Sequence, residues 1–400
     1  MRIGLFTKTY PPIPDGVSYY VSQAKRAMEK EHDVTVFTTR TIFGRYVPAP
    51  VAEEENVLRF PAVPYPHYPQ YPVPLFPYGR MICEAKKRGL EIVHAHTPFI
   101  MGAGAYLVHK HLQVPLVSTF HTNFVEMRGT VGGRITNLFL IDLGWWYTCG
   151  LYKRSDVVIA PTRKMADFLR KEGLDNVEVV WDGIDISPFL GGGGRAGSED
   201  GDVWRNFCER TGVPAFDDGD GPLVLFLGRV TRDKGVYVLL DAAAGLHRKH
   251  GASFIVAGTG PEEFALREEV KKRGMTGFFF VPGYVSDAEK VALLRRADVF
   301  VLPSRAETFG MVLLEAMAAG VPVVAAASGG IVEVVEDGKN GLLVPFGDSE
   351  ALAEAISSVL SDGRLRSSLV STGKQFVVER GTIQTSVRRT IEIYESLLRR

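Results

Sequence analysis

Short, continuously apolar runs alternate with longer helical patterns along most of the chain. Apolar residues recur at helical spacing between the predicted strands, for example at Val17–Lys30 and Arg163–Lys171. Strands that lack a polar–apolar alternation are typical of parallel strands covered on both faces. The pattern therefore predicts an α/β protein with doubly wound parallel sheets. The predicted strands are Ile3–Phe6, Val34–Thr38, Ile92–His94, Leu116–Thr119, Val157–Ala160, Val177–Val180, Leu223–Leu227, Phe254–Ala257, Phe278–Val281, Val299–Leu302, Val323–Ala326 and Leu342–Val344.

Residues 191–221 interrupt this alternation, because glycine and acidic residues dominate there apart from a helical pattern at Val203–Arg210. A chain of 400 residues exceeds what one core usually organises, so we expect two domains. We expect ligands at the carboxyl ends of the strands, in a cleft between the domains, and a terminal helix, Ile383–Leu398, that could return to the first domain. The predicted parts are an N-terminal Rossmann-like domain (1–185), a linker or insertion (186–221), a C-terminal Rossmann-like domain (222–380) and the terminal helix (381–400).

Composition narrows the functional class. Forty-six basic and 46 acidic residues balance, which argues against bulk affinity for nucleic acid. The three cysteines are few and far apart, so neither a disulfide framework nor a zinc motif is indicated, and a reducing cytoplasm is expected. The first apolar run meets Pro11 and Pro12 too soon for a signal peptide, and no run is long enough to span a membrane.

The stretch GRVTRDKG, residues 228–235, directly follows a predicted strand and precedes a predicted helix. Arg229 and Lys234 would therefore lie at the top of a parallel sheet, beside a helix N-terminus. Two cations at such a place form a site for an anion, and arginine suits phosphate in particular. The plain alternative is a pair of solvated loop charges.

The stretch RAETFGMVLLEAMAAGVPVV, residues 305–324, places Glu307 and Glu315 in an apolar segment. A buried carboxylate needs a partner. If the segment is a loop that leads into a helix, the N–H groups of Phe309, Gly310 and Met311 are available, and both carboxylates can bind vicinal hydroxyls. The alternative is that backbone groups or Arg305 satisfy these carboxylates.

Polar residues also follow strands of the first half. Gly16 would let the backbone approach a phosphate or a sugar, and His121 follows the strand Leu116–Thr119. His94 and His96 could bind a metal from one strand, but no third ligand stands at a suitable spacing, so no metal is expected.

Taken in order, these motifs resemble the family-4 retaining glycosyltransferases of GT-B fold. The resemblance covers nearly the whole chain apart from 191–221. It rests on GRVTRDKG, VAGTGPEE (256–263), VPGYVS (281–286) and the two glutamates separated by seven residues, together with MRIGLFTKTYPPIPDGVSYYV, HAHTPF, FHTNF and SDVVIAPT in the first half.

The resemblance implies that a nucleotide sugar supplies the partners of both glutamates. Arg229 and Lys234 would hold its diphosphate, Glu307 its sugar and Glu315 its ribose, with no metal cofactor. Gly16 would close on the diphosphate, and His121 would contact the sugar near the reacting carbon. Catalysis would fall to His121, Arg229, Lys234 and Glu307, and donor binding to Gly16, Arg229, Lys234, Gly258, Tyr284, Val285, Glu307, Phe309, Gly310, Met311 and Glu315.

The acceptor is expected to be a membrane lipid, of glycerolipid or phosphoinositide type. Asp15 stands where the family often has glycine, and FHTNF resembles the acceptor segment of glycolipid-forming members, so Asp15, His121 and Asn123 are assigned to the acceptor. The proline- and aromatic-rich segment 60–78 cannot be a regular helix and could line an acceptor site or contact a membrane. The helix Ile135–Tyr152 is apolar nearly all round, which favours burial over membrane contact.

The sequence thus predicts a cytoplasmic enzyme, in contact with the inner face of the cell membrane, that transfers a hexose from a UDP- or GDP-sugar. A soluble acceptor such as a sugar phosphate, and a nucleotide-binding module without turnover, stay open as alternatives. A glycosidase would have no use for two cations that hold a diphosphate, Arg229 and Lys234, which we call the diphosphate clamp. A Rossmann dehydrogenase would carry Gly-x-Gly-x-x-Gly after the first strand, and this chain does not.

Overall fold

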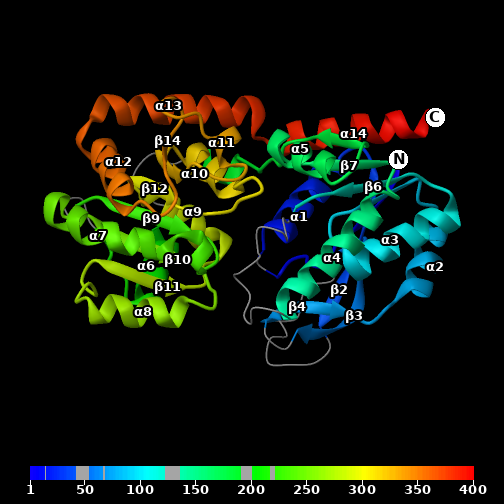
Figure 1. Cartoon of the computed structure of the whole chain (residues 1–400), viewed down its shortest axis with the longest axis horizontal. Coiled ribbons are helices and arrows are strands. Elements are labelled where there is room, and N and C mark those ends of the chain that lie inside the picture. Colours follow the sequence, from blue (N-terminus) through cyan, green and yellow to red (C-terminus); the bar gives the residue numbers. More distant parts are fainter. Residues whose placement is uncertain (14, 42–53, 66–67, 122–135, 191–200, 217–220) are drawn as a thin grey trace. The chain divides into compact units, whose positions relative to one another are not determined.

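The computed structural model describes residues 1–13, 15–41, 54–65, 68–121, 136–190, 201–216 and 221–400. The chain divides into two compact units, of which unit 1 is Met1–Ile184 with Ile383–Arg400 and unit 2 is Asp185–Thr382. Each unit has one largely parallel sheet with helices packed on it (Figure 1). The predicted α/β class with two doubly wound, Rossmann-like domains is confirmed.

Unit 2 contains a six-stranded sheet in which every pair of neighbours is parallel. Every residue of its four central strands is buried, which explains why their sequences lack polar alternation. The strands, in spatial order, are β11 (Phe279–Gly283), β10 (Ser253–Ala257), β9 (Leu223–Leu227), β12 (Val299–Leu302), β13 (Val323–Ala326) and β14 (Leu342–Val344).

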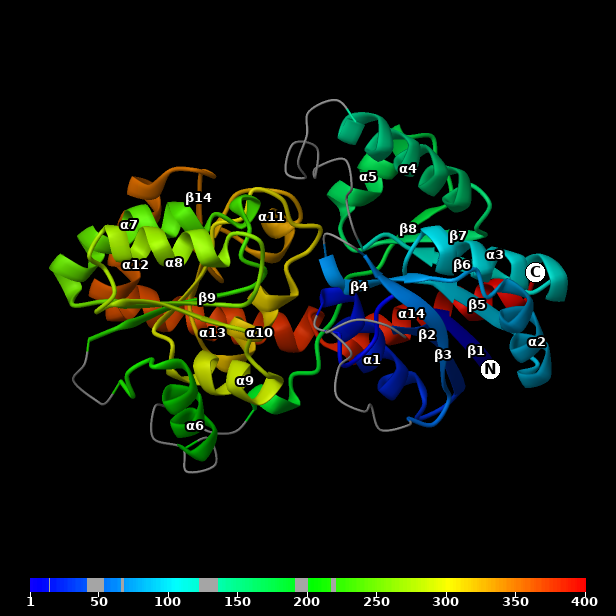
Figure 2. The same cartoon turned by 90° about the horizontal axis from the view of Figure 1, so that it is seen from below.

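Helices cover both faces of this sheet (Figure 2). On one face α7 packs against α8 and α12, and on the other α10 packs against α9 and α13. Helix α6 adds to the second layer by packing on α9. Their bounds are α6 (Gly201–Thr211), α7 (Val236–His250), α8 (Glu263–Lys272), α9 (Asp287–Arg296), α10 (Met311–Ala319), α11 (Ile331–Val334), α12 (Ser349–Ser361) and α13 (Gly363–Arg380), with short 3₁₀ turns η1 (Ser187–Phe189) and η2 (Arg232–Lys234).

The order of the strands reverses between β9 and β12. From β9 the chain runs outward through β10 to β11, then returns to β12 and continues through β13 to β14. Open α/β sheets bind ligands at such a switch point, at the carboxyl ends of the strands. In unit 2 this place is formed by the loops 228–235 and 303–310.

These two loops are held together by backbone contacts. The N–H of Arg305 donates to the carbonyl of Asp233 at 2.7 Å. Gly235 has φ +72°, and a Cβ atom there would lie 1.9 Å from the carbonyl oxygen of Pro303, so no other residue fits. The N–H of Gly330 donates to the carbonyl of Glu307 at 2.7 Å, which fixes the second loop from its other side.

Unit 1 contains an eight-stranded sheet whose order reverses between β1 and β5. All neighbours are parallel except β3 and β4. The strands, in spatial order, are β4 (Tyr68–Pro74), β3 (Val57–Tyr65), β2 (Asp33–Thr41), β1 (Arg2–Phe6), β5 (Ile92–Ala95), β6 (Leu116–Thr119), β7 (Val157–Ala160) and β8 (Val177–Val179).

Strands β3 and β4 were not predicted. They lie in the proline-rich stretch, where the expectation was only that no regular helix forms. Proline removes a ladder donor and is therefore tolerated best at a sheet edge. Strand β4 is the edge strand, which explains how three prolines fit into Tyr68–Pro74.

The terminal helix α14 (Ile383–Leu398) belongs to unit 1, where it packs against α1 (Gly16–Met28). The N–H of Ile383 donates to the carbonyl of Ile184 at 2.8 Å. Among the described residues no helix is both long and apolar enough to cross a membrane. The other helices of unit 1 are α2 (Tyr78–Arg88), α3 (Phe99–Leu112), α4 (Thr136–Tyr152) and α5 (Arg163–Lys171).

A buried histidine connects α14 to the sheet. His94 Nδ1 lies 2.5 Å from the hydroxyl of Tyr394 on α14, and its Nε2 lies 2.6 Å from Thr119 Oγ1. Burial, reinforced by the nearby His121, lowers the pKa of His94 to about 3. Burial also lowers the pKa of His96 well below its usual value. Both rings are therefore neutral in the folded chain at any pH near neutrality.

We expect unit 1 to lose stability as the pH falls below about 6.5, where these histidines gain protons only after unfolding. The folded pKa lies below the unfolded value, so the contribution is complete above 6.5 and decreases toward 3. At pH 5 the His94 contribution to the free energy of unfolding should fall by about 2 kcal/mol. Urea unfolding at pH 7.5 and 5.0 measures it. His94→Gln should flatten this pH dependence and the exposed His111→Gln should not; equal slopes in both variants would contradict the assignment.

Gly235 offers a second test of the fold. We expect Gly235→Ala to lower the free energy of unfolding by at least about 2 kcal/mol, because it adds a clash to a left-handed backbone. Gly245 on α7 is the matched control, since no atom lies within 4 Å of the place that a Cβ atom would take and the helix favours alanine there. Gly245→Ala should leave stability unchanged or raise it. Similar unfolding midpoints for the two variants would show that the two loops do not need this close approach.

Candidate functional site

The switch point of unit 2 brings together Lys234 and Glu307. Lys234 ends η2 in the loop after β9, and Glu307 lies in the loop between β12 and α10. The lysine ammonium donates a hydrogen bond to the carboxylate, and the two side chains are only 12% and 16% exposed. An ion pair this sheltered is screened less by salt than a surface pair, and it holds the two side chains in one orientation.

Arg229 lies in the same loop as Lys234 but is exposed. Its guanidinium makes no side-chain hydrogen bond or ion pair with any residue that the structure describes. The helices that follow the two loops, α7 and α10, have Gly235 and Gly310 at their N-caps, and glycine has no side chain that could cap a helix. An unpaired guanidinium in a loop that leads to a helix N-terminus is a favourable place for phosphate.

Glu315 is paired as well. Its carboxylate, in a side chain that is 5% exposed on α10, accepts a hydrogen bond from Lys290 of α9 at 2.6 Å. Within the protein, the two glutamates are thus paired with lysines rather than with backbone groups or Arg305. Their predicted contact with sugar hydroxyls stays a prediction. Carboxylate oxygens can accept further hydrogen bonds, so both can still bind hydroxyls.

The residues predicted to donate N–H groups lie around the start of α10. Gly310 has φ +91° and ψ +54°, and Met311 is the first helical residue. The ring of Phe309 is only 1% exposed and belongs to the core, so its predicted role is limited to its backbone. Lys290 was not predicted as part of the site, because only the packing of α9 on α10 brings it to Glu315.

The residues predicted from VAGTGPEE (256–263) and VPGYVS (281–286) lie at the ends of β10 and β11. Gly258 has φ +135°, and a Cβ atom there would lie 1.9 Å from the carbonyl oxygen of Gly228. Its N–H donates to the carbonyl of Gly283 at 2.8 Å. Tyr284 follows directly and is 51% exposed, and Val285 is half-buried. These residues therefore share the carboxyl edge of the sheet with Arg229.

In unit 1, His121 lies in a polar cluster at the end of β6. Its Nε2 is 3.1 Å from His96 Nδ1, and its Nδ1 is 3.6 Å from Asp182 Oδ2. The ring of Tyr20 packs against it, with centroids 5.2 Å apart. Asp182 was not predicted to act in the site, because it is far from His121 in sequence. A carboxylate at Nδ1 favours the tautomer with its proton on that nitrogen.

Of the other residues predicted in unit 1, Asp15 and Asn123 were assigned to the acceptor and Gly16 to the diphosphate of the donor. The carboxylate of Asp15 accepts the N–H of Ser18 at 2.7 Å and caps α1, which gives it a structural function. Gly16 is the first residue of that helix and is exposed. Asn123 lies outside the described residues. Within the described part of the chain, no group of three or more His, Cys, Asp or Glu side chains could hold a metal ion.

Comparison with known proteins identifies the chain. Residues 214–376 match the model of the family "Glycosyl transferases group 1", and residues 14–188 match "Glycosyltransferase Family 4". A D-inositol 3-phosphate glycosyltransferase of Xylanimonas cellulosilytica is 30% identical over 89% of this chain and 86% of that protein. An alpha-monoglucosyldiacylglycerol synthase of Acholeplasma laidlawii is 26% identical over 88% of this chain and 87% of that protein.

The fold has solved counterparts. The crystal structure of Anabaena HepE in complex with UDP and glucose matches with a TM-score of 0.75 and 20% identity, over 99% of this chain and 100% of that one. The resemblance seen in the ordered motifs is confirmed by the two family models and the relatives together. The chain belongs to glycosyltransferase family 4, group 1 of the glycosyl transferases, and is a glycosyltransferase.

Proposed function

We propose that this enzyme moves a hexose from a UDP- or GDP-sugar to a hydroxyl of a membrane lipid, of glycerolipid or phosphoinositide type, with retention of anomeric configuration and without a required metal. The observation that carries the donor assignment is the Lys234–Glu307 pair at the switch point of unit 2, beside Arg229, whose side chain has no partner among the described residues. Retention is what the family resemblance implies.

The charges suggest how the donor is held. Arg229 and Lys234 bind the diphosphate, and the first N–H groups of α10 add their dipole. Glu307, fixed by Lys234, accepts hydroxyls of the hexose, and Glu315, fixed by Lys290, accepts those of the ribose. Tyr284 and Val285 face the base, and Gly258 belongs to the donor-binding residues beside them. His121 meets the sugar near the reacting carbon, with Asp182 orienting its ring.

The same groups account for the chemistry. When the bond from the anomeric carbon to the diphosphate breaks, negative charge grows on the diphosphate oxygens. Fixed cations and helix dipoles stabilise this charge where it develops, so no protein acid is required to protonate the leaving group. A nucleotide-binding module without turnover would not need a carboxylate oriented by a lysine beside an arginine that is open to a ligand.

An aromatic surface on unit 1 supports a lipid acceptor. The rings of Phe99 and Tyr147 stack with centroids 6.1 Å apart, and those of Phe76 and Tyr78 lie 6.0 Å apart. Phe76 is 69% exposed and Trp146 is 72% exposed. Exposed aromatic rings are suited to a lipid–water interface. We call Phe76, Tyr78, Phe99, Leu143, Trp146 and Tyr147 the aromatic patch.

The apolar pattern of α4 favoured burial over membrane contact, and the structure shows that one part of this helix is buried and another part is exposed. Trp145 and Tyr152 of this helix are buried, whereas Leu143 and Trp146 are exposed. A protein that contacts the inner face of the cell membrane through such a surface would meet its lipid acceptor there. The name of the Acholeplasma laidlawii relative, a synthase of alpha-monoglucosyldiacylglycerol, supports the same acceptor class.

A soluble sugar phosphate is the second candidate acceptor. It is favoured by the relative of 30% identity, which is named for D-inositol 3-phosphate. The donor site in unit 2 would serve either acceptor, so the choice depends on unit 1 alone.

We expect Arg229→Ala to lower hexose transfer by about 100- to 1,000-fold, because it removes a cation at the leaving group. Since Arg229 has no partner among the described residues, the variant should keep its melting point. Arg248→Ala, on the opposite end of α7, is the matched control and should keep full activity. Glu307→Gln should also lose activity. The assay uses a panel of UDP-, GDP- and ADP-sugars, after a thermal-shift screen with the three diphosphates.

Near-normal turnover in Arg229→Ala would rule out the diphosphate clamp. Nucleotide binding by the unaltered chain without transfer from any donor would instead favour the module without turnover.

Flotation with vesicles tests the acceptor. We expect the enzyme to float with vesicles that contain anionic lipid and diacylglycerol, and the double variant Phe76→Ala, Trp146→Ala to stay unbound, because it removes the two most exposed rings of the patch. Phe264→Ala is the control, since this ring of α8 in unit 2 is 77% exposed. An unaltered enzyme that stays in solution would favour the sugar phosphate instead.

A further inference from the structure

Helix α6 lies between the two regions that match the family models, which end at residue 188 and resume at 214. The helix is firmly attached to unit 2. Trp204 and Phe207 are buried, and the indole N–H of Trp204 donates to the carbonyl of Ala215 at 2.7 Å. The guanidinium of Arg296, on α9, lies 4.7 Å from the centre of the Trp204 ring. These contacts fix the position of α6 on α9.

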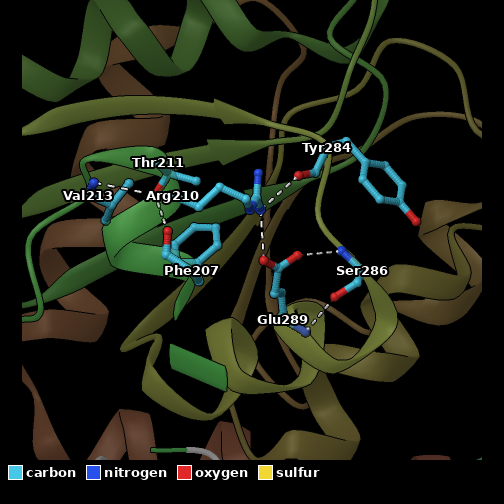
Figure 3. Close-up of polar contacts among 7 residues, drawn as sticks. All are labelled: Phe207, Arg210, Thr211, Val213, Tyr284, Ser286 and Glu289. Atoms are coloured by element: carbon cyan, nitrogen blue, oxygen red, sulfur yellow. Dashed lines mark hydrogen bonds and ion pairs between the residues drawn. The ribbon is translucent and has the colours of Figure 1, made fainter. Parts of the chain in front are cut away.

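The side chain of Arg210, on α6, reaches the segment that follows β11 (Figure 3). One nitrogen of its guanidinium, Nη2, donates to the carboxylate of Glu289 at 2.7 Å and lies 3.3 Å from the backbone carbonyl of Tyr284. The guanidinium also lies 5.8 Å from the centre of the Phe207 ring. These contacts join α6 to the start of α9 and to the loop before it.

Glu289 continues the connection into the loop. Its second carboxylate oxygen accepts the N–H of Ser286 at 2.7 Å, and the hydroxyl of Ser286 accepts the N–H of Glu289 at 3.3 Å. This reciprocal pair is a capping box that begins α9. Arg210 thus holds the loop at both ends, at the carbonyl of Tyr284 and, through Glu289, at Ser286.

The side chain of Tyr284 takes no part in these contacts. Its ring points away from Arg210 (Figure 3), and the residue is 51% exposed. Arg210 therefore fixes the backbone of the loop and leaves the ring and the neighbouring backbone groups open to a ligand. The next residue of α9 after Glu289 is Lys290, which pairs with Glu315. One turn of α9 thus connects the Tyr284 loop to the buried carboxylate of α10.

We propose that Arg210 is a positioning residue for nucleobase recognition: from α6 it holds Tyr284–Ser286 in the conformation that receives the base of the donor, and so contributes to the choice between bases. The inference rests on the proposed function, because it assumes that a nucleotide binds at this edge of the sheet. Arg210 does not contact the diphosphate clamp or the hexose carboxylate, so it acts on donor affinity and not on the chemical step.

A purely structural role makes a different prediction. The Arg210 side chain is 48% exposed, and an ion pair of this kind contributes little to the stability of the fold. A structural role alone would leave nucleotide binding unchanged when Arg210 is replaced, or would lower affinity for every ligand in parallel with a loss of stability.

The test compares Arg210→Ala, Arg210→Lys and Arg205→Ala. Arg205 lies on the same helix, is 69% exposed and pairs only with Asp202 among the described residues, so it is the matched control. Calorimetric titration with UDP, GDP, ADP and inorganic pyrophosphate measures binding, and KM and kcat are measured with the best donor of the panel. Pyrophosphate probes the clamp without a base.

We expect Arg210→Ala to bind the preferred nucleoside diphosphate about five- to tenfold more weakly and to discriminate less among the three bases. Pyrophosphate affinity, the melting point and kcat should stay unchanged, and KM for the donor should rise. Arg210→Lys should recover part of the affinity, because an ammonium can still donate to Glu289 or to the Tyr284 carbonyl. Arg205→Ala should behave like the unaltered enzyme.

Two results would overturn the inference alone: unchanged base discrimination in Arg210→Ala, or an equal loss for pyrophosphate and the nucleotides. Failure of the unaltered enzyme to bind any of the three nucleoside diphosphates would overturn the proposed function, and the inference with it.

Discussion

The ion pair between Lys234 and Glu307 is the interaction on which the switch point of unit 2 depends. It joins the two loops that leave β9 and β12, at the point where the strand order of unit 2 reverses. Backbone contacts bring the two loops together. Gly235 lets the first loop pass close to Pro303, and the carbonyl of Asp233 accepts the N–H of Arg305. A carboxylate in an apolar segment thereby has a hydrogen-bonding partner and a fixed orientation.

Glu315, the second carboxylate, is likewise paired with a lysine. Glu315 is buried on α10 and is paired with Lys290 of α9, whose neighbour Glu289 is in turn held by Arg210 of α6. Charged side chains of α6, α9 and α10 are thus connected within the helix layer on one face of the sheet. Of the charged residues predicted for the donor, Lys234, Glu307 and Glu315 have partners within unit 2, whereas Arg229 makes no side-chain hydrogen bond or ion pair with the described residues.

Unit 1 contains a buried histidine cluster and the aromatic patch. Its histidines lie in a buried, hydrogen-bonded cluster in which His94 is held by Tyr394 of the terminal helix, and His121 lies near Asp182. Burial keeps His94 and His96 neutral, so they act as oriented dipoles and not as charges. The aromatic patch belongs to the same unit, and its rings come from α4, from the start of α3 and from the segment that leads into α2. The aromatic patch and the loops of the proposed donor site thus belong to different units of the chain.

The sequence by itself determined the order and type of most elements, because buried parallel strands and amphipathic helices leave distinct periodicities. Strands such as Leu116–Thr119, Val299–Leu302 and Leu342–Val344 have the predicted bounds, whereas β3 and β4 were missed because proline conceals an edge strand. Local sequence also indicated Arg229, Lys234, Glu307 and Glu315, since each stands in a segment where a charge next to a strand end or inside an apolar helix is unusual. Only the tertiary structure decided their partners. In unit 2, Lys290 meets Glu315 because α9 packs on α10, and Arg210 meets the Tyr284 loop because α6 packs on α9. In unit 1, Asp182 lies near His121 although the two are far apart in the sequence. Sequence spacing indicates none of these contacts, because they arise only when the elements pack together.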